Sequence, residues 1–446
     1  ARGMRLPLPI SLEVSVMQKE RQGILPFRIV QSHEPLIARG GLVLPYEMAK
    51  AMKLPEVIDR ELPGPGSGRG YWPSKFVIPL VLMLHGGGKK LEDLREIKGE
   101  VSLRELLGMK EMPASTTVGD WLRRMGENPR GLAGLARVEK HEVGEVVKRD
   151  ARSQYTLDVD ATVIEADKEE ARWTYKKEKG YQPMLGFLFE LGLIVADEFR
   201  DGNVPAQSGA VEFLERCQQM MPKGKRIAYY RADSASYQAR VIDRCIAESV
   251  LFSITADQDK AVKEAIKSIG KKEWQPYERE REIADTVHTM NSTKRAFRLI
   301  VQRWPKLQAE LFDRDPYCYH VIATNREEPA KEVVALHNQR GQAENFIKEL
   351  KEGFGMEWMP CGETSANAVF FRIGVIAYNL FQAMKLLSFP SWWRTFTIAT
   401  ARWRLYQTAA QVVRHAHQVL LKLAAPGDKI KVFQQMRRRC VQVAYG

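Results

Sequence analysis

The chain has 446 residues, of which 44% are hydrophobic, and its formal net charge is +13. This length allows two or three domains, and this apolar content excludes a globally disordered chain. The excess of positive charge favours a polyanionic partner.

The five cysteines lie far apart and form no C-x-x-C pair, which argues against a zinc knuckle or a disulfide framework. The N-terminus lacks a signal-peptide pattern. The apolar runs at residues 76–84 and 370–387 are too short, or too interrupted by polar residues, to span a bilayer. We therefore expect a cytoplasmic protein with no membrane partner.

Residues 1–150 are expected to form a mostly helical region. The glycine-rich segment 64–70 predicts a linker or loop. After it, apolar residues recur at helical spacing, and Ser115 or Thr116 can cap a last, basic helix. A helix-turn-helix that binds DNA ends has this pattern, and so does a plain helical bundle.

The middle of the chain alternates strands and helices. Strands are expected at residues 154–159, 184–189, 193–199, 226–230 and 251–255, and helices at residues 209–220 and 235–249. This order is that of a mixed α/β sheet of the RNase H-like kind. No glycine-rich phosphate loop follows a strand, which argues against an ATPase or a nicotinamide enzyme. We predict an RNase H-like catalytic core over residues 151–255 and 326–385.

Residues 256–325 have a strand-rich pattern and are expected to be a β-rich insertion. A long helix at residues 331–351 and an apolar helical segment at 370–387 follow. Residues 386–446 are expected to form a basic helical region, since ten Lys or Arg and one acid follow residue 390. Tryptophans among these cations suit contact with a DNA backbone, although a solvated basic face has the same composition.

Acidic residues follow two of the predicted strands. In the first strand, Asp158 and Asp160 lie on one face, and Leu157 and Val159 lie on the other. Two carboxylates on one face are costly unless a cation neutralises them. Asp233 follows a second apolar strand, although a single aspartate at a strand end is more often a turn or cap residue.

The predicted helix at residues 331–351 carries a third acid. His337, Arg340, Glu344 and Lys351 fall within an arc of roughly 60° at 100° per residue. A surface helix with a mixed-charge stripe has the same pattern. Together with the two aspartates, however, Glu344 completes the carboxylate set that two-metal phosphoryl transfer requires. Hard oxygen ligands select Mg²⁺ or Mn²⁺, and Arg340 and Lys351 would hold phosphates.

These motifs resemble insertion-sequence transposases of the DDE class, in the subgroup with a Tyr-Arg-Glu-Lys signature. The signature places three residues between Arg and Glu and six between Glu and Lys, as in "HNQRGQAENFIKELK". "DAT" at Asp160 and "RADSASY" at Asp233 resemble the two aspartate motifs. The spacing to Thr162 favours Asp160 over Asp158 as the metal ligand, and Asp158 remains the alternative ligand.

The resemblance implies further roles. His337 stands where the family has the Tyr that, with Arg340 and Lys351, grips a DNA phosphate, and a histidine can also donate a hydrogen bond. The β-rich insertion lies between the second Asp and the Glu. In relatives it supports a DNA hairpin intermediate with an aromatic stacked on a flipped base. Trp304 and Trp274 are the candidates, and a core position is the alternative for each.

The resulting hypothesis is a cut-and-paste transposase that works as a homodimer on paired transposon ends in the nucleoid. Asp160, Asp233 and Glu344 would be both the catalytic residues and the ligands of two Mg²⁺ ions, which Mn²⁺ could replace. The alternatives are a catalytically silent DNA-binding protein and an RNase H-like nuclease without strand transfer.

Overall fold

The computed structural model describes residues 29–446 except for 67, 294, 307–314 and 416–417. The chain forms two compact units, Ala1–Pro35 and Leu36–Gly446. Residues 29–35, the described part of the first unit, contain no helix or strand. Residues 1–28, which belong to the predicted N-terminal region, lie outside the described residues.

Helices dominate the second unit up to residue 147. They are α1 (Val43–Ala51), α2 (Leu54–Glu61), α3 (Ser74–Gly86), α4 (Leu94–Gly99), α5 (Val101–Leu106), α6 (Ser115–Glu127) and α7 (Pro129–Val147), with the short turns η1 (Gly40–Leu42) and η2 (Leu91–Asp93). Asn128 and Pro129 fix the start of α7. The Asn128 side chain accepts a hydrogen bond from the Arg130 N–H at 2.9 Å, and Pro129 occupies the first turn, where no N–H donor is needed.

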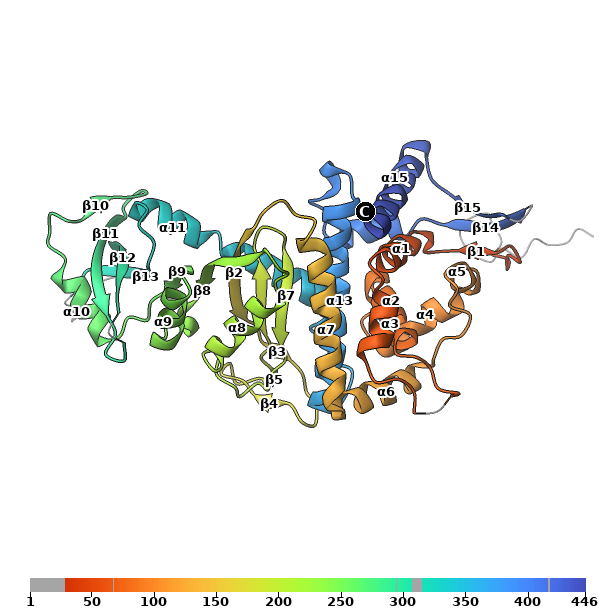
Figure 1. Cartoon of the computed structure of the whole chain (residues 1–446), viewed down its shortest axis with the longest axis horizontal. Helices are drawn as coiled ribbons and strands as arrows, with labels where there is room; N and C mark the ends of the chain where they lie inside the picture. Colours follow the sequence, from red (N-terminus) through yellow and green to blue (C-terminus); the bar gives the residue numbers. More distant parts are fainter. Residues whose placement is uncertain (1–28, 67, 294, 307–314, 416–417) are drawn as a thin grey trace, which may run out of the picture. The chain divides into compact units, whose positions relative to one another are not determined.

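The middle of the chain folds into a nine-stranded mixed sheet, which confirms the α/β fold class (Figure 1). The strand order is β10-β11-β12-β13-β9-β8-β2-β6-β7. The strands are β2 (Gln154–Ala161), β6 (Met184–Leu188), β7 (Leu193–Glu198), β8 (Arg226–Ala232), β9 (Leu251–Thr255), β10 (Gln275–Pro276), β11 (Glu282–Thr289), β12 (Ala296–Pro305) and β13 (Tyr317–Thr324). The pairs β2–β8 and β8–β9 are parallel, and the other pairs are antiparallel. The strands predicted from alternation are confirmed and differ only at their ends.

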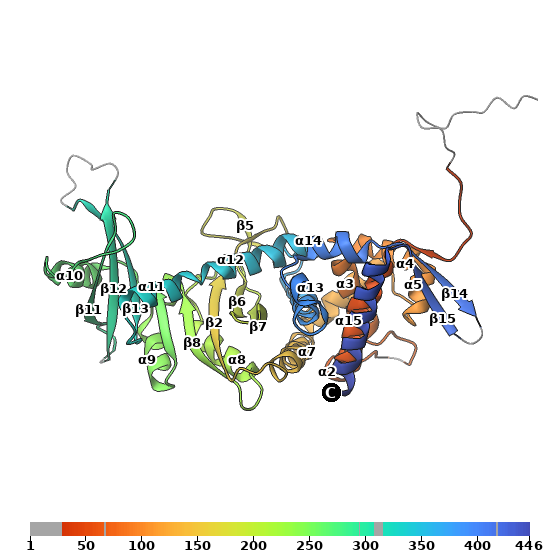
Figure 2. The same cartoon turned by 90° about the horizontal axis from the view of Figure 1, so that it is seen from above.

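The two faces of β2 meet different helices. The helices of this part are α8 (Ala210–Met220), α9 (Ala239–Ala247), α10 (Lys260–Ser268), α11 (Ala330–Asn338) and α12 (Gly341–Lys348). On one face, a Cβ added at Gly186 would lie 3.2 Å from Leu157 and 3.3 Å from Phe213 of α8. On the face with the aspartates, the ring of Phe187 lies 5.6 Å from that of Phe346 in α12. Figure 2 shows α11 and α12 along one side of the sheet and α8 and α9 along the other.

The prediction of one helix over residues 331–351 is wrong. The structure divides it into α11, α12 and a π-helical turn, η4 (Glu349–Gly353). Between α11 and α12 the chain tightens, since the Arg340 N–H donates to the His337 carbonyl at 2.9 Å and the Ala343 N–H donates to the Arg340 carbonyl at 2.8 Å. A tight turn and a π turn both change the 100° spacing of side chains. The side chains from His337 to Lys351 therefore do not share one stripe.

The β-rich segment continues the central sheet, because β13 pairs with β9. The boundaries predicted at residues 150, 255, 325 and 385 stay predictions, since residues 36–446 form one compact unit. Two smaller sheets were not predicted. One has the order β3-β5-β4 and the other the order β1-β14-β15. Their strands are β3 (Ile164–Glu165), β4 (Arg172–Trp173), β5 (Lys179–Tyr181), β1 (Leu36–Ile37), β14 (Ala410–His415) and β15 (Gln418–Leu423).

Residues 386–446 were predicted to form a basic helical region. The structure shows that this region also contains strands. Helix α14 (Ile398–Ala401) and the turns η6 (Ser391–Trp393) and η7 (Arg402–Tyr406) precede the β14–β15 hairpin, and α15 (Gly427–Tyr445) follows it. Several of these cations contact protein groups: Arg394 and Arg439 donate to the carbonyls of Leu386 and Phe389, Arg402 to that of His85, and Arg414 and Arg437 pair with Glu105 and Glu47. Part of the basic character of this region is thus structural.

Helix α13 (Thr364–Ala383), which runs on into η5 (Met384–Ser388), covers the edge of the central sheet. The side-chain amide of Asn379 bonds both backbone groups of Ile194 in edge strand β7, at 2.9 and 2.8 Å. These bonds protect the edge against pairing with another chain. Residues 364–388 form the one described helix long and apolar enough to cross a membrane, and 83% of its apolar stretch is buried inside the protein.

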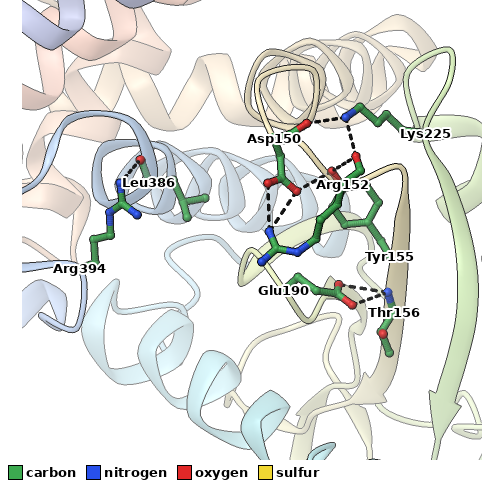
Figure 3. A network of polar contacts seen from close by, with 8 residues as sticks. All are labelled: Asp150, Arg152, Tyr155, Thr156, Glu190, Lys225, Leu386 and Arg394. Carbon is green, nitrogen blue, oxygen red and sulfur yellow. Dashed lines mark hydrogen bonds and ion pairs between the residues drawn. The ribbon is translucent and has the colours of Figure 1, made fainter. Parts of the chain in front are cut away.

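A polar network fixes the start of β2 (Figure 3). The Tyr155 hydroxyl donates to Asp150 Oδ2 at 2.8 Å, and Arg152 pairs with the same carboxylate at 3.0 Å. Both carboxylate oxygens of Glu190 accept the Thr156 N–H, at 3.0 and 3.1 Å. The strand therefore enters the sheet in a fixed register and carries its aspartates towards the opposite end.

Helix α7 carries two buried glutamates, Glu139 and Glu142. Glu142 is 0% exposed, and neither of its carboxylate oxygens has a hydrogen-bond partner among the described residues. Burial raises its pKa well above the usual value, and the neighbouring Glu139 raises it further. A carboxyl group in this position is stable only when protonated.

We expect Glu142→Met to raise the free energy of unfolding by about 1–3 kcal/mol, because it removes a buried polar group that has no partner. The pKa of Glu142 in the folded protein lies above the unfolded value of about 4.3. The wild type thus loses stability as the pH rises from the unfolded pKa towards the folded pKa, because the unfolded chain releases its proton first. The advantage of the variant should therefore be larger at pH 8 than at pH 5. Urea unfolding at both pH values measures this difference. The exposed Glu127, changed to Met, is the control, and an equal advantage at both pH values would contradict the assignment.

Candidate active site

Two aspartates lie side by side at the ends of parallel strands. Asp160 is near the end of β2, and Asp233 directly follows β8. Val159 pairs with Ala232 across these strands, so the residues that follow them emerge at the same end of the sheet. Asp233 also caps the turn η3 (Ser234–Ser236), because its side chain accepts the Ala235 N–H at 3.1 Å.

Arg340 joins the two aspartates. Its Nη2 lies 3.4 Å from Asp160 Oδ1 and 3.7 Å from Asp233 Oδ2. Glu344 lies one helical turn further along α12 and is exposed. The pKa of Asp160 is raised to about 6, chiefly by burial; Arg340 lowers it, and the charges of Asp233 and Glu344 raise it. The structure thus brings the two predicted aspartates together at Arg340, and Glu344 lies on the helix that begins after this arginine.

The donor chemistry of this site suits a hard divalent cation, since all three side chains offer carboxylate oxygens. Their spacing is different from that of a ready metal site. Within the described ranges, no group of three His, Cys, Asp or Glu side chains is arranged to hold a metal ion. For Asp160 and Asp233 the reason is that the Arg340 guanidinium lies beside the oxygens of both side chains, where a metal ion would bind.

Asp158, the alternative ligand, has a different partner. Its two oxygens accept hydrogen bonds from Arg231 Nε at 2.6 Å and Nη2 at 2.8 Å. Both side chains are buried, and Arg231 Nη1 also donates to the Leu336 carbonyl of α11 at 2.6 Å. Asp158 therefore links β2, β8 and α11, while Asp160 faces Arg340. Sequence reasoning missed Arg231, although an arginine within an apolar strand is itself a signal of a buried acidic partner.

His337 does not reach the carboxylates. It is buried, its Nε2 lies 3.1 Å from the Thr255 hydroxyl, and its Nδ1 lies 3.1 Å from the Ser253 hydroxyl. Its pKa is lowered to about 3, chiefly by burial and in smaller part by the nearby His320, Arg340 and Arg231. These contacts use both ring nitrogens of His337 and do not favour its predicted role in gripping a phosphate, which stays a prediction. The ring packs α11 against β9 as a neutral group.

Lys351 lies in the π turn η4 and points towards the small β3-β5-β4 sheet. Its Nζ donates to the Val163 carbonyl at 2.7 Å, and burial lowers its pKa. Lys351 lines a cavity of about 630 Å³ together with Lys176, Glu357 and the exposed Trp358. No contact links it to the three acids, so its predicted role with phosphate stays a prediction.

The two tryptophans predicted for base stacking are covered by arginines. Trp274 is 8% exposed and has the Arg303 guanidinium 3.8 Å from its ring centroid. Trp304 is half-buried, and the Arg281 guanidinium lies 5.0 Å from its ring. The stacking role remains a prediction, and these contacts favour the packing alternative.

The contacts of Asp158 and Asp160 predict opposite effects on stability. Asp158→Asn should lower the free energy of unfolding by about 3–5 kcal/mol, because it leaves the buried Arg231 without its counter-ion. Asp160→Asn should leave the free energy unchanged or raise it, since burial and the charge of Asp233 disfavour the Asp160 carboxylate by more than the contact with Arg340 stabilises it. Urea unfolding at pH 7.5 measures both. A larger loss in Asp160→Asn than in Asp158→Asn would contradict this division of roles.

Comparisons with known proteins identify the family of the chain. One solved structure, titled "Cryo-EM structure of piggyBac transposase synaptic complex with hairpin DNA (SNHP)", is 9% identical, with a TM-score of 0.43 over 78% of this chain and 74% of that chain. No curated protein matches the chain. The model of the family "Transposase DDE domain group 1" matches residues 31–443. The chain therefore belongs to the DDE-domain transposases of group 1.

Proposed function

We propose that the protein is a DNA transposase that binds terminal inverted repeats, cleaves the transposon ends and joins the freed 3′-hydroxyl to target DNA. The observation that carries this proposal is the meeting of Asp160 and Asp233 at Arg340, one helical turn from Glu344. Three elements that are far apart in the sequence supply these groups. Membership of the DDE transposase family supports the same reading.

The strand order supports an RNase H-like catalytic core. Within the central sheet, the strands β7-β6-β2-β8-β9 are adjacent in that order, and β2, β8 and β9 are parallel. The first aspartate is in the central strand of this set and the second follows its parallel neighbour. This arrangement places both carboxylates at the same end of parallel strands, where α/β proteins commonly bind ligands.

In this proposal Asp160, Asp233 and Glu344 hold two divalent ions, Mg²⁺ or Mn²⁺. When bound, the ions activate the attacking oxygen and stabilise the leaving oxygen of a phosphodiester. The three carboxylates orient this chemistry at the sheet end, and Arg340 donates hydrogen bonds to a DNA phosphate. His337 holds α11 against β9 and so positions Arg340 and Glu344.

Water attack breaks a phosphodiester and frees a 3′-hydroxyl at each transposon end. In the proposed sequence, that hydroxyl attacks a phosphodiester of the opposite strand, the 3′-oxygen of the flanking DNA leaves, and a hairpin forms. Water then attacks the hairpin phosphodiester, and the 3′-oxygen of the transposon end leaves. The regenerated 3′-hydroxyl then attacks target DNA, with the target's own 3′-oxygen as the leaving group. The hairpin, and a homodimer that pairs the two ends, rest on the resemblance to the Tyr-Arg-Glu-Lys subgroup.

The C-terminal region offers a surface for the DNA backbone. Trp392 and Trp403 are 63% and 78% exposed, and Arg404 follows Trp403 on η7, with its guanidinium 5.2 Å from the Phe396 ring centroid. Cations beside exposed aromatics suit a salt-sensitive contact with phosphates and bases.

The test is incubation of the full-length protein with linear DNA that carries the inverted repeats flanking its gene, with and without Mg²⁺. We expect Mg²⁺-dependent cleavage at the repeat ends and strand-transfer products. Asp233→Ala and Glu344→Ala should each lower the rate by at least about 10²-fold, the usual cost of removing one preorganised catalytic group. Glu127→Ala, an exposed acid on α6, is the matched control.

Full activity in Asp233→Ala or Glu344→Ala would refute the assignment of these residues. Cleavage without joined products would indicate a nuclease, and binding without cleavage would indicate a silent DNA-binding protein.

A further inference from the structure

Arg340 and Arg231 both face aspartates of β2, but their contacts differ. Arg231 forms two short hydrogen bonds to Asp158 and a third to a backbone carbonyl. Arg340 has longer contacts, 3.4 and 3.7 Å, from a single nitrogen to two different aspartates. Arg231 thus binds one carboxylate through two hydrogen bonds. Arg340 instead lies between two carboxylates and forms no such paired hydrogen bonds with either.

Arg340 also has an unused donor. Its Nε–H is buried and has no hydrogen-bond acceptor among the residues that the structure describes. A guanidinium is best satisfied by a group that accepts two parallel hydrogen bonds, such as a phosphate. A phosphate would therefore satisfy more of the Arg340 donors than the two aspartates do in this structure.

Of the three residues predicted to grip a phosphate, only Arg340 contacts the catalytic acids. His337 is bonded to β9, and Lys351 to the Val163 carbonyl. The backbone of Arg340 is fixed on both sides, through its own N–H and its carbonyl. Its side chain can therefore leave the aspartates while the turn between α11 and α12 stays intact.

We propose that Arg340 is an internal counter-cation that competes with divalent metal for Asp160 and Asp233 until a DNA phosphate draws it away. DNA binding and metal binding are then coupled, because each removes the same guanidinium from the same oxygens, and coupling of this kind is reciprocal. The protein thereby assembles its metal site chiefly on DNA. This inference rests on the proposed function, since it takes the two aspartates as metal ligands.

The test measures Mn²⁺ binding at pH 8 by the electron paramagnetic resonance signal of free Mn²⁺, on the full-length protein without DNA. Arg340→Gln should bind Mn²⁺ more tightly than the wild type, on the order of ten-fold, within the range typical of coupled sites. Lys331→Gln removes one positive charge from an exposed position on α11 and should leave the affinity unchanged. Addition of a short DNA duplex should tighten Mn²⁺ binding by the wild type more than by Arg340→Gln.

Equal or weaker Mn²⁺ binding by Arg340→Gln would overturn the inference, as would an equal gain in Lys331→Gln. Asp160→Asn separates this failure from failure of the proposed function. If Asp160→Asn leaves Mn²⁺ binding unchanged, the proposed metal site itself is wrong. Circular dichroism checks that each variant folds. Arg340→Lys is a second variant, which keeps the positive charge but loses the planar guanidinium. It should bind Mn²⁺ more tightly than the wild type, but by a smaller factor than Arg340→Gln.

Discussion

Two carboxylates that end neighbouring parallel strands repel each other, and the fold must supply positive charge to hold them together. In this protein the charge comes from Arg340, which lies within 3.7 Å of both aspartates. Because Arg340 and Glu344 belong to the same short stretch of chain, the helix that neutralises the pair also delivers the third acid. The placement of α11 and α12 over the sheet is therefore the constraint on which the site depends.

Several buried polar contacts hold that placement. The Asp158–Arg231 pair joins β2 to β8, and Arg231 continues to a carbonyl of α11. His337 joins α11 to β9 through two hydroxyl groups. A buried ion pair adds little net stability compared with apolar packing, but breaking it is costly. These contacts thus fix the register of strands and helix, and with it the positions of Asp160, Asp233 and Glu344.

Much of the fold could be predicted from periodicity. The strands β2, β6, β7, β8 and β9 follow their alternating or apolar segments, and the acids at their ends follow from the parallel arrangement. The division of the helix at Gln339 and Arg340 could not be predicted from periodicity, because the segment has helical periodicity throughout and only tertiary contacts favour the tighter turn. The β14–β15 hairpin was missed because the cations and tryptophans of the region around it favoured a helical, DNA-facing interpretation.

The sequence names candidate site residues but not their contacts. Spacing and resemblance single out Asp160, Asp233 and Glu344, and this assignment stays a prediction. The sequence could not show that Asp158 already has both oxygens bonded to Arg231. Nor could it show that His337 is buried, since a polar residue on a helix is as easily exposed. Such assignments depend on which side chains lie across a strand pair or beneath a helix, and one sequence does not contain that information.

The most direct test of the account is the anomalous diffraction signal of Mn²⁺ in crystals of the protein with a short DNA duplex. The account predicts Mn²⁺ density bounded by oxygens of Asp160, Asp233 and Glu344, with the Arg340 guanidinium turned to a DNA phosphate. Mn²⁺ density away from these carboxylates, with Arg340 still between the two aspartates, would contradict it.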